Sequence, residues 1–344
     1  MNPLKQLYQE GQSIWLDFIR RSLITSGELN RLIDEDGVSG MTSNPSIFQK
    51  AIAGSADYDE SLRRALDKNP HQDIERLCEV LVIEDIQMAA DVLRPVYDHT
   101  NGGDGYVSVE VSPKLADDTK RTIAEAKRLW KAVGRPNVMI KVPATAAGVP
   151  ALEALIASGI NINATLMFSL GHYESIAAAY IRGLAKCERP ETVASVASFF
   201  VSRVDSAVDR ALEANGSPEA LELRGKAAVA NAKLAYARFG EIFFGDEFVA
   251  HAARGARVQR PLWASTSTKN PEYRDVKYVE ELIGPNTVNT LPPATLDAFR
   301  EHGQVEPALA EDLEEARELL KRIEAFGIDL GAVTEKLQVD GVAA

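Results

Sequence analysis

Three ionisable residues stand in or next to short apolar runs, where a buried strand would normally carry none. Lys141 lies in the run 138–142, Glu110 lies between valines in 106–112, and Asp17 lies near the end of 14–18. Lysine is almost never fully buried unless it is paired or functional. A neutral lysine amine can form a Schiff base with a carbonyl, and carboxylates can move the protons this needs. The three residues therefore indicate a nucleophilic lysine with an acid/base pair.

Each of these residues also has a structural interpretation. The Lys141 stem could run along the strand to water, or its amine could form a purely structural ion pair. Asp17 or Glu110 could cap the end of a strand or helix. Neither carboxylate decides the matter alone, but the three groups together favour a catalytic set.

Neutral polar residues follow or occupy other apolar runs. Asn44 follows residues 38–43, and Ser198 lies within 193–201. Asn163 and Thr165 are two residues apart and so share one face of a strand. Buried substrate hydroxyls need hydrogen-bond partners. These four side chains are typical of a site for a polyhydroxylated substrate, although each alone is more often structural.

A second group suits phosphate. Arg203 follows the sixth apolar run at the start of a helical pattern, and a guanidinium beside a helix N-terminus binds phosphate well. Ser265 and Lys269 lie in a hydroxyl-rich stretch after the seventh run. We expect these residues at the phosphate end of the site, while an ordinary solvated loop is the alternative for Lys269.

The elements that must position these groups alternate along the chain. Eight runs could form strands: residues 14–18, 38–43, 106–112, 138–142, 162–168, 193–201, 258–264 and 287–290. Helical patterns separate most of them, including 115–133, 151–157, 172–186 and 204–214. The alternation predicts parallel pairing, in a closed (β/α)₈ barrel or in a doubly wound open sheet. A barrel would gather the polar residues at the carboxyl ends of its strands.

The length of 344 residues exceeds a bare barrel of about 250 residues by roughly 90. Helical patterns over 61–68 and 73–97 enlarge the connection between the second and third strands. A tail pattern over 307–326 starts at a proline and stops at a glycine. We expect one domain over residues 1–344, with a barrel core over about 13–302 and a helical tail over 303–344.

Composition excludes several function classes. The formal net charge of -12 argues against nucleic acid or an anionic membrane as the main partner. No leader-like or membrane-spanning run is present, so a cytoplasmic protein is expected. The sequence has no dinucleotide-binding fingerprint, no P-loop and no metal-ligand motif. We therefore expect an enzyme without metal or cofactor.

The ordered motifs of this chain resemble those of the transaldolases, in their long bacterial form. The matching stretches are WLD (15–17), GMTSNPSIF (40–48), VSVEV (107–111), MIKVPAT (139–145), INATLMFS (162–169) and SFFVSR (198–203). Any one stretch is weakly specific, whereas the ordered set over about residues 13–300 is highly specific. The resemblance implies a (β/α)₈ barrel and a metal-free class I Schiff-base enzyme of the non-oxidative pentose phosphate pathway.

The resemblance also implies roles for the residues. Lys141 forms the imine with a ketose phosphate. Glu110 moves protons through a water held by Thr165, and Asp17 takes the proton from the C4 hydroxyl. The remaining implied contacts are with the three-carbon unit, from Asn44 and Asn163, and with the phosphate end, from Ser198 and Arg203. The three-carbon unit then passes to an aldose phosphate.

Two positions bear on the choice within this superfamily. Short transaldolases carry a phosphate-binding arginine after strand 7, and here Lys269 is the nearest cation. Fructose 6-phosphate aldolases carry a tyrosine that can protonate the enamine at the position of Phe200, and phenylalanine cannot do so. Such an aldolase, or a non-catalytic barrel that binds sugar phosphates, are the alternatives. Monomer and homodimer both stay open.

Overall fold

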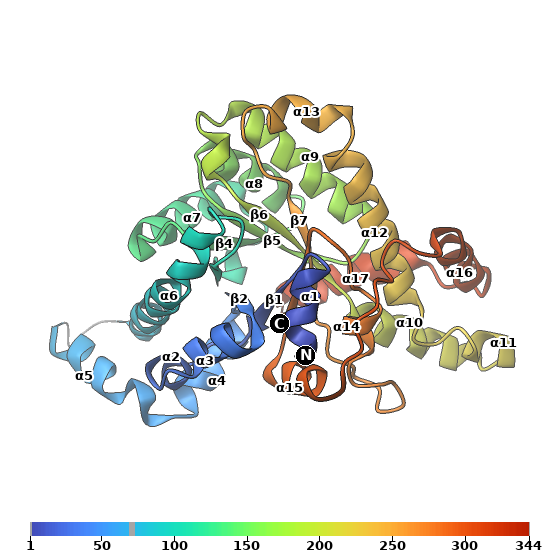
Figure 1. Cartoon of the computed structure of the whole chain (residues 1–344), viewed down its shortest axis with the longest axis horizontal. Coiled ribbons are helices and arrows are strands. Elements are labelled where there is room, and N and C mark those ends of the chain that lie inside the picture. Colours follow the sequence, from blue (N-terminus) through green and yellow to red (C-terminus); the bar gives the residue numbers. More distant parts are fainter. Residues whose placement is uncertain (1, 69–72, 344) are drawn as a thin grey trace.

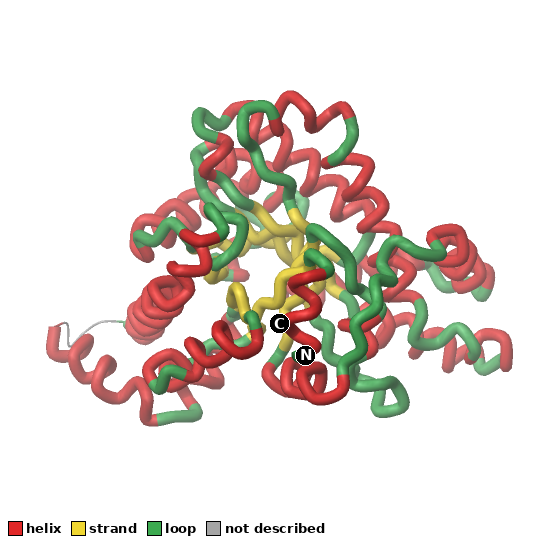
Figure 2. Tube along the Cα trace, viewed as in Figure 1, coloured by secondary structure: helices red, strands yellow, loops and turns green. Residues whose placement is uncertain are grey.

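The computed structural model describes residues 2–68 and 73–343, and a closed sheet of eight parallel strands forms its centre (Figures 1 and 2). The strands are β1 (Gln12–Asp17), β2 (Val38–Thr42), β3 (Tyr106–Glu110), β4 (Val138–Pro143), β5 (Ile162–Met167), β6 (Ser195–Phe200), β7 (Arg260–Ala264) and β8 (Thr287–Leu291). Each strand pairs with its neighbours in sequence order, and β8 pairs with β1. The expected barrel is confirmed, and an open sheet is excluded.

Alternation along the strands separates two apolar cores. In β3, Val107 and Val109 are buried among the helix-facing side chains, whereas Tyr106 belongs to a cluster inside the barrel. Trp15 and Met139 belong to the same inner cluster. A strand places successive side chains on opposite faces, so Glu110 shares the inner face with Tyr106. Glu110 therefore lies at the carboxyl end of the barrel, next to the apolar side chains that fill its interior.

Helices surround the sheet on the outside (Figure 2). Those before β6 are α1 (Pro3–Gln9), α2 (Arg21–Thr25), α3 (Glu28–Asp36), α4 (Pro45–Ala53), η1 (Ala56–Tyr58), α5 (Asp59–Lys68), α6 (Ile74–His99), η2 (Pro113–Leu115), α7 (Thr119–Val133), α8 (Gly148–Ala157), α9 (Leu170–Lys186) and η3 (Pro190–Thr192). Those after β6 are α10 (Ser202–Asn215), α11 (Pro218–Leu221), α12 (Ala227–Phe243), α13 (Asp246–Ala252), α14 (Lys277–Glu280), α15 (Pro293–His302), α16 (Leu313–Ala325) and α17 (Leu330–Ala343). None of the helices in these described ranges is both long and apolar enough to cross a membrane.

The additional helices lie partly where they were expected. The enlarged connection between β2 and β3 contains α4, η1, α5 and α6, and the tail contains α16 and α17. The connection between β6 and β7 is enlarged as well, because it holds α10 to α13. This enlargement of the connection between β6 and β7 was not expected from the sequence. The helix α12 is rich in alanine and buried along much of its length. Its small side chains give only a weak amphipathic pattern, so the sequence does not mark it clearly as a helix.

The tail also differs from its expected form. The expected helix 307–326 begins only at Leu313, so Pro307 does not occupy its first turn. Asp312, the residue before α16, has a left-handed backbone conformation. The helix therefore does not continue into the residues that precede Asp312. Gly327 ends the helix as expected, with φ at +81°. A second helix, α17, was not expected, and its two glycines lower its intrinsic helix propensity.

Candidate active site

The Lys141 amine lies at the carboxyl end of the barrel in contact with Glu110. The two residues are direct neighbours across β3 and β4. Lys141 Nζ donates to Glu110 Oε2 at 3.2 Å and to the Ser43 carbonyl oxygen at 3.2 Å. The Lys141 side chain is only 9% exposed. The stem of Lys141 therefore does not run out to water, and its amine forms an ion pair with a carboxylate.

Asp17 ends β1 next to β2 and β8. The Thr42 hydroxyl donates to Asp17 Oδ1 at 2.7 Å, and the Thr42 and Thr290 hydroxyls lie 2.7 Å apart. Burial raises the pKa of the Asp17 carboxyl, while the Lys141 charge and the Thr42 hydrogen bond act in the opposite direction. A carboxylate with a raised pKa is a stronger proton acceptor than an exposed one.

One cavity of about 390 Å³ opens above these groups. It is lined by eight of the ten predicted site residues: Asp17, Asn44, Lys141, Thr165, Ser198, Arg203, Ser265 and Lys269. Its volume suits a small polyhydroxylated molecule. Across residues 2–68 and 73–343, no group of three or more His, Cys, Asp or Glu side chains is placed to hold a metal.

The other two predicted residues lie next to this cavity and do not line it. Glu110 contacts the cavity-lining Lys141, and it lines a neighbouring pocket between α4, α6 and α7. Asn163 is fully buried; its Nδ2 donates to Ser108 Oγ at 3.0 Å and its Oδ1 accepts from Ser198 Oγ at 2.6 Å. The amide of Asn163 therefore holds the Ser198 hydroxyl by a hydrogen bond. A direct contact between Asn163 and a substrate stays a prediction.

Two further polar side chains have groups free for a ligand. Asn44 is the N-cap of α4, where its side-chain oxygen accepts from the Ile47 amide at 2.9 Å. This use of the oxygen leaves the amide hydrogens available at the cavity. Within the described part of the chain, the buried Thr165 hydroxyl has no hydrogen-bond partner. A buried hydroxyl of this kind needs a partner, which a water or a substrate can supply.

The segments that follow β6 and β7 bring positive charge to the cavity. Arg203 is the second residue of α10, its guanidinium lies 5.4 Å from the centre of the Phe200 ring, and α10 has no side-chain N-cap. Partial burial and the neighbouring charge of Arg203 lower the pKa of Lys269. Ser265 connects the two segments, since its hydroxyl lies 2.9 Å from that of Ser202. The helix start and the two cations together are suited to an anion.

Two buried carboxylates of α10 connect the segments that carry Arg203 and Lys269. Asp205 accepts from the Tyr278 hydroxyl, and Asp209 from the Tyr273 hydroxyl, both at 2.7 Å. Burial raises the pKa of Asp205 to about 6 and also raises that of Asp209. Both aspartates belong to α10, and both tyrosines belong to the connection between β7 and β8. The ties therefore join the helix of Arg203 to the segment of Lys269.

Sequence reasoning assigned no role to several residues that line the cavity, among them Thr290 and Lys50. Thr290 is the last residue but one of β8, so the strand-end rule that found Asp17 could have found it. Lys50 lies within α4, where a lysine at an exposed helix position is ordinary. No local pattern distinguishes it.

Comparison with known proteins agrees with this geometry. Residues 14–344 match the family model described as transaldolase/fructose-6-phosphate aldolase. The chain is 51% identical to the transaldolase of Thiobacillus denitrificans, with 99% of this chain and 96% of that protein covered. It is 47% identical to the transaldolases of Thermobifida fusca and Mycobacterium marinum, with 99% of this chain and 94% and 93% of those proteins covered. The chain therefore belongs to the transaldolase/fructose-6-phosphate aldolase family.

Proposed function

We propose that this chain is a transaldolase that acts through a Schiff base on Lys141. It would transfer a dihydroxyacetone unit from sedoheptulose 7-phosphate or fructose 6-phosphate to glyceraldehyde 3-phosphate or erythrose 4-phosphate, in the non-oxidative pentose phosphate pathway. The observation that carries the proposal is the 3.2 Å contact of the Lys141 amine with Glu110, on a cavity that Asp17 also lines. A lysine nucleophile with two carboxylates suits a reaction that forms and breaks bonds beside a carbonyl.

The first step is attack of the neutral Lys141 amine on the C2 carbonyl of the ketose phosphate. The C–N bond forms, the carbonyl π electrons move to oxygen, and this oxygen takes a proton. Loss of water from the carbinolamine then leaves a protonated imine. Glu110 accepts and returns the protons through a water held by Thr165, whose hydroxyl is without a partner in the described residues.

The second step breaks the C3–C4 bond. Asp17 takes the proton from the C4 hydroxyl, the C4–O bond becomes a carbonyl, and the electrons of the C3–C4 bond move into the imine. The aldose phosphate leaves, and the three-carbon unit stays on Lys141 as an enamine. The raised pKa of Asp17 favours this proton transfer.

The third step repeats these events in reverse with a second aldehyde. The enamine carbon attacks the acceptor carbonyl, Asp17 returns the proton, and hydrolysis of the imine frees Lys141. Phe200 lines the cavity and has no proton to give to the enamine. The enamine would therefore wait for an acceptor, which favours transfer over simple aldol cleavage.

The positive end of the cavity would hold the substrate phosphate. Arg203 can offer a planar fork of donors, whereas Lys269 offers a compact charge. The uncapped start of α10 and the cavity-lining Ser265 and Ser198 add polar groups at the same end. Asn44 and Asn163 would serve the hydroxyls of the three-carbon unit, directly or through Ser198.

We further infer that the chain acts as one domain, because α16 packs against α12 and α17 packs against α10 and β5. The barrel would supply the chemistry, and the added helices would cover and brace it. A cytoplasmic location, and a monomeric or homodimeric state, stay predictions from the sequence.

The acceptor dependence of product release tests this function. Purified protein is mixed with fructose 6-phosphate, and glyceraldehyde 3-phosphate is measured with and without erythrose 4-phosphate. A transaldolase releases one equivalent per site and then stops until the acceptor is added. Continuous release without an acceptor would identify a fructose 6-phosphate aldolase instead. Binding without any release would identify a non-catalytic barrel.

A further inference from the structure

The C-terminal helix α17 sends one amide side chain into the catalytic end of the barrel. Gln338 is 9% exposed, and its Nε2 donates to the carbonyl oxygens of Ala144 and Leu166 at 3.1 and 3.0 Å. Both hydrogens of a single amide nitrogen thus bind carbonyl oxygens, one just beyond β4 and one within β5. Ala144 follows β4, which carries Lys141, and Leu166 follows Thr165 in β5.

The bond to Leu166 meets the backbone where β5 is irregular. Leu166 has φ at +63°, a left-handed conformation that is costly for a branched side chain. Between Ala164 and Met167 the pairing with β6 shifts by one residue, so β5 bulges there. A bulge turns a carbonyl away from the ladder and redirects the neighbouring side chain. The side chain next to it in this strand is Thr165.

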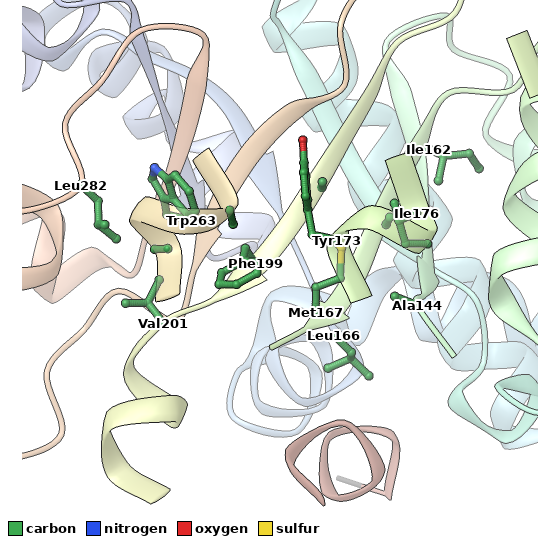
Figure 3. Close-up of a cluster of buried hydrophobic side chains, with 14 of the residues drawn as sticks. Ala144, Ile162, Leu166, Met167, Tyr173, Ile176, Phe199, Val201, Trp263 and Leu282 are labelled. Carbon is green, nitrogen blue, oxygen red and sulfur yellow. The ribbon is translucent and has the colours of Figure 1, made fainter. Parts of the chain in front are cut away.

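The same helix makes further contacts around this bulge. In Figure 3 the Leu166 side chain extends toward a helix drawn in faint red at the lower edge, and Gly341 of α17 packs against Leu166. The Glu335 carboxylate lies 2.9 Å from His172 Nε2, and His172 Nδ1 accepts from the Phe168 amide at 3.3 Å. These contacts place α17 along the end of β5 rather than on remote surface.

We propose that Gln338 is a positioning residue for the proposed Schiff-base reaction. By holding the Leu166 carbonyl it stabilises the bulge that directs the Thr165 hydroxyl into the cavity, and by holding Ala144 it fixes β4 relative to β5. The inference rests on the proposed function, since Thr165 matters only if imine formation needs its water. Gln338 itself lines no part of the cavity, so it acts through Thr165 and through the end of β4.

A structural role and a positioning role make different predictions. If Gln338 only braced the fold, its loss would lower thermal stability and reduce all steps together. If it positions Thr165, its loss slows imine formation more than it weakens substrate binding. Small displacements of catalytic groups lower rates by about 10- to 100-fold. The Michaelis constant for fructose 6-phosphate should therefore stay within about twofold while imine formation slows by that factor.

The test is rapid-quench trapping with borohydride. Wild type, Gln338→Ala, Gln338→Glu and the control Lys336→Gln are mixed with fructose 6-phosphate, and the modified fraction is measured by mass against time. Glutamate keeps the shape of glutamine but, as a carboxylate, cannot donate to the two carbonyls. Lys336 lies on the same helix, and its amine bonds to Asp340 of that helix. Thermal unfolding is recorded for each protein.

We expect slow trapping in both Gln338 variants and wild-type trapping in Lys336→Gln, with Gln338→Ala still folded at the assay temperature. If Gln338→Ala traps as fast as wild type, the positioning role is overturned and the proposed function stands. An equal slowdown in Lys336→Gln, or a rise in the Michaelis constant that matches the loss of rate, also contradicts it. If wild type traps no adduct, the proposed function itself fails, and this inference fails with it.

Discussion

The two ends of the cavity are built in different ways. At the chemical end, Asp17, Glu110 and Lys141 come from three strands, and their positions follow from the barrel register. At the phosphate end, Arg203 starts a helix and Lys269 lies in the connection between β7 and β8. The first end is rigid because the sheet is rigid. The second depends on side-chain ties between segments.

This difference has a functional consequence. Groups that make and break bonds must be held closely, and strand ends achieve this. In the proposed reaction every sugar substrate carries the same phosphate, so that end of the site needs charge more than rigid geometry. Variants at the chemical end should therefore lower kcat, and variants at the phosphate end should raise KM.

The largest effect is expected for Lys141→Met. The variant removes the nucleophile, so kcat for the transfer should fall by at least about 10³-fold. Lys269→Met is the matched control, because Lys269 lines the same cavity from the segment after β7. It should raise KM and keep most of kcat. Equal losses of kcat in the two variants would remove the distinction between the ends.

The next effect is expected for Asp17→Asn. The amide cannot take the C4 proton, so cleavage should slow by about 10²- to 10⁴-fold while the imine still forms. Borohydride should then trap a six-carbon sugar phosphate on the variant. In Glu110→Gln the imine itself should form slowly. A three-carbon adduct at the wild-type rate on Asp17→Asn would contradict the role of Asp17.

At the phosphate end, Arg203→Ala should raise KM for fructose 6-phosphate. Loss of charged hydrogen bonds to the phosphate is expected to cost about 10- to 100-fold in KM, with little change in kcat. Unphosphorylated fructose should be used equally by wild type and variant. Arg210→Ala is the control, since Arg210 lies on the same helix and is bonded to the Ser206 carbonyl. An equal loss on fructose would argue against phosphate contact.

A smaller effect on KM is expected when one of the tyrosine–aspartate hydrogen bonds is removed. Tyr273→Phe removes the hydrogen bond to Asp209 and loosens the segment of Lys269. We expect a loss of about 1 kcal/mol in the free energy of unfolding and a rise in KM of roughly threefold. Tyr236→Phe, the control, also removes one tyrosine hydrogen bond, an exposed one to the Pro285 carbonyl. This control should lower the free energy of unfolding without changing KM. A change in KM in Tyr236→Phe would show that the KM effect of Tyr273→Phe is not specific to the bond with Asp209.

The smallest effect at neutral pH is expected for Thr42→Val. The Thr42 hydrogen bond lowers the pKa of Asp17, so its removal raises that pKa further. Asp17 must be ionised to act as a base, so the acid limb of the kcat/KM profile should move to higher pH. At pH values well above the limb the rate should be unchanged. Thr290→Val leaves the bond to Asp17 in place and should keep the wild-type limb.

The strands and the chemical end could be predicted from the sequence for a simple reason. A charged residue within a buried apolar run is costly, so Lys141 and Glu110 stand out without any knowledge of distant contacts. Parallel strands bring their carboxyl ends together, which joins Asp17 to them. Local pattern and barrel geometry are then enough.

The hydrogen bonds that hold the phosphate end together, and the form of the tail, could not be predicted in this way. Tyr273 and Asp209 lie 64 residues apart, and nothing local links a surface-type tyrosine to an aspartate of another helix. The left-handed conformation of Leu166 has no cue in its residue type, because leucine rarely adopts it. Gln338 lies in a glycine-containing helix whose pattern is weak. Tertiary contacts decide all three features.

The central claim is that Lys141 carries the three-carbon unit between the two sugars. Incubation of the wild-type protein with fructose 6-phosphate, followed by borohydride and peptide mass analysis, tests it most directly. The account predicts a three-carbon adduct on Lys141 that disappears when erythrose 4-phosphate is added before the borohydride, because the acceptor removes the unit. An unmodified chain that still transfers the unit, or an adduct on another lysine, would contradict it.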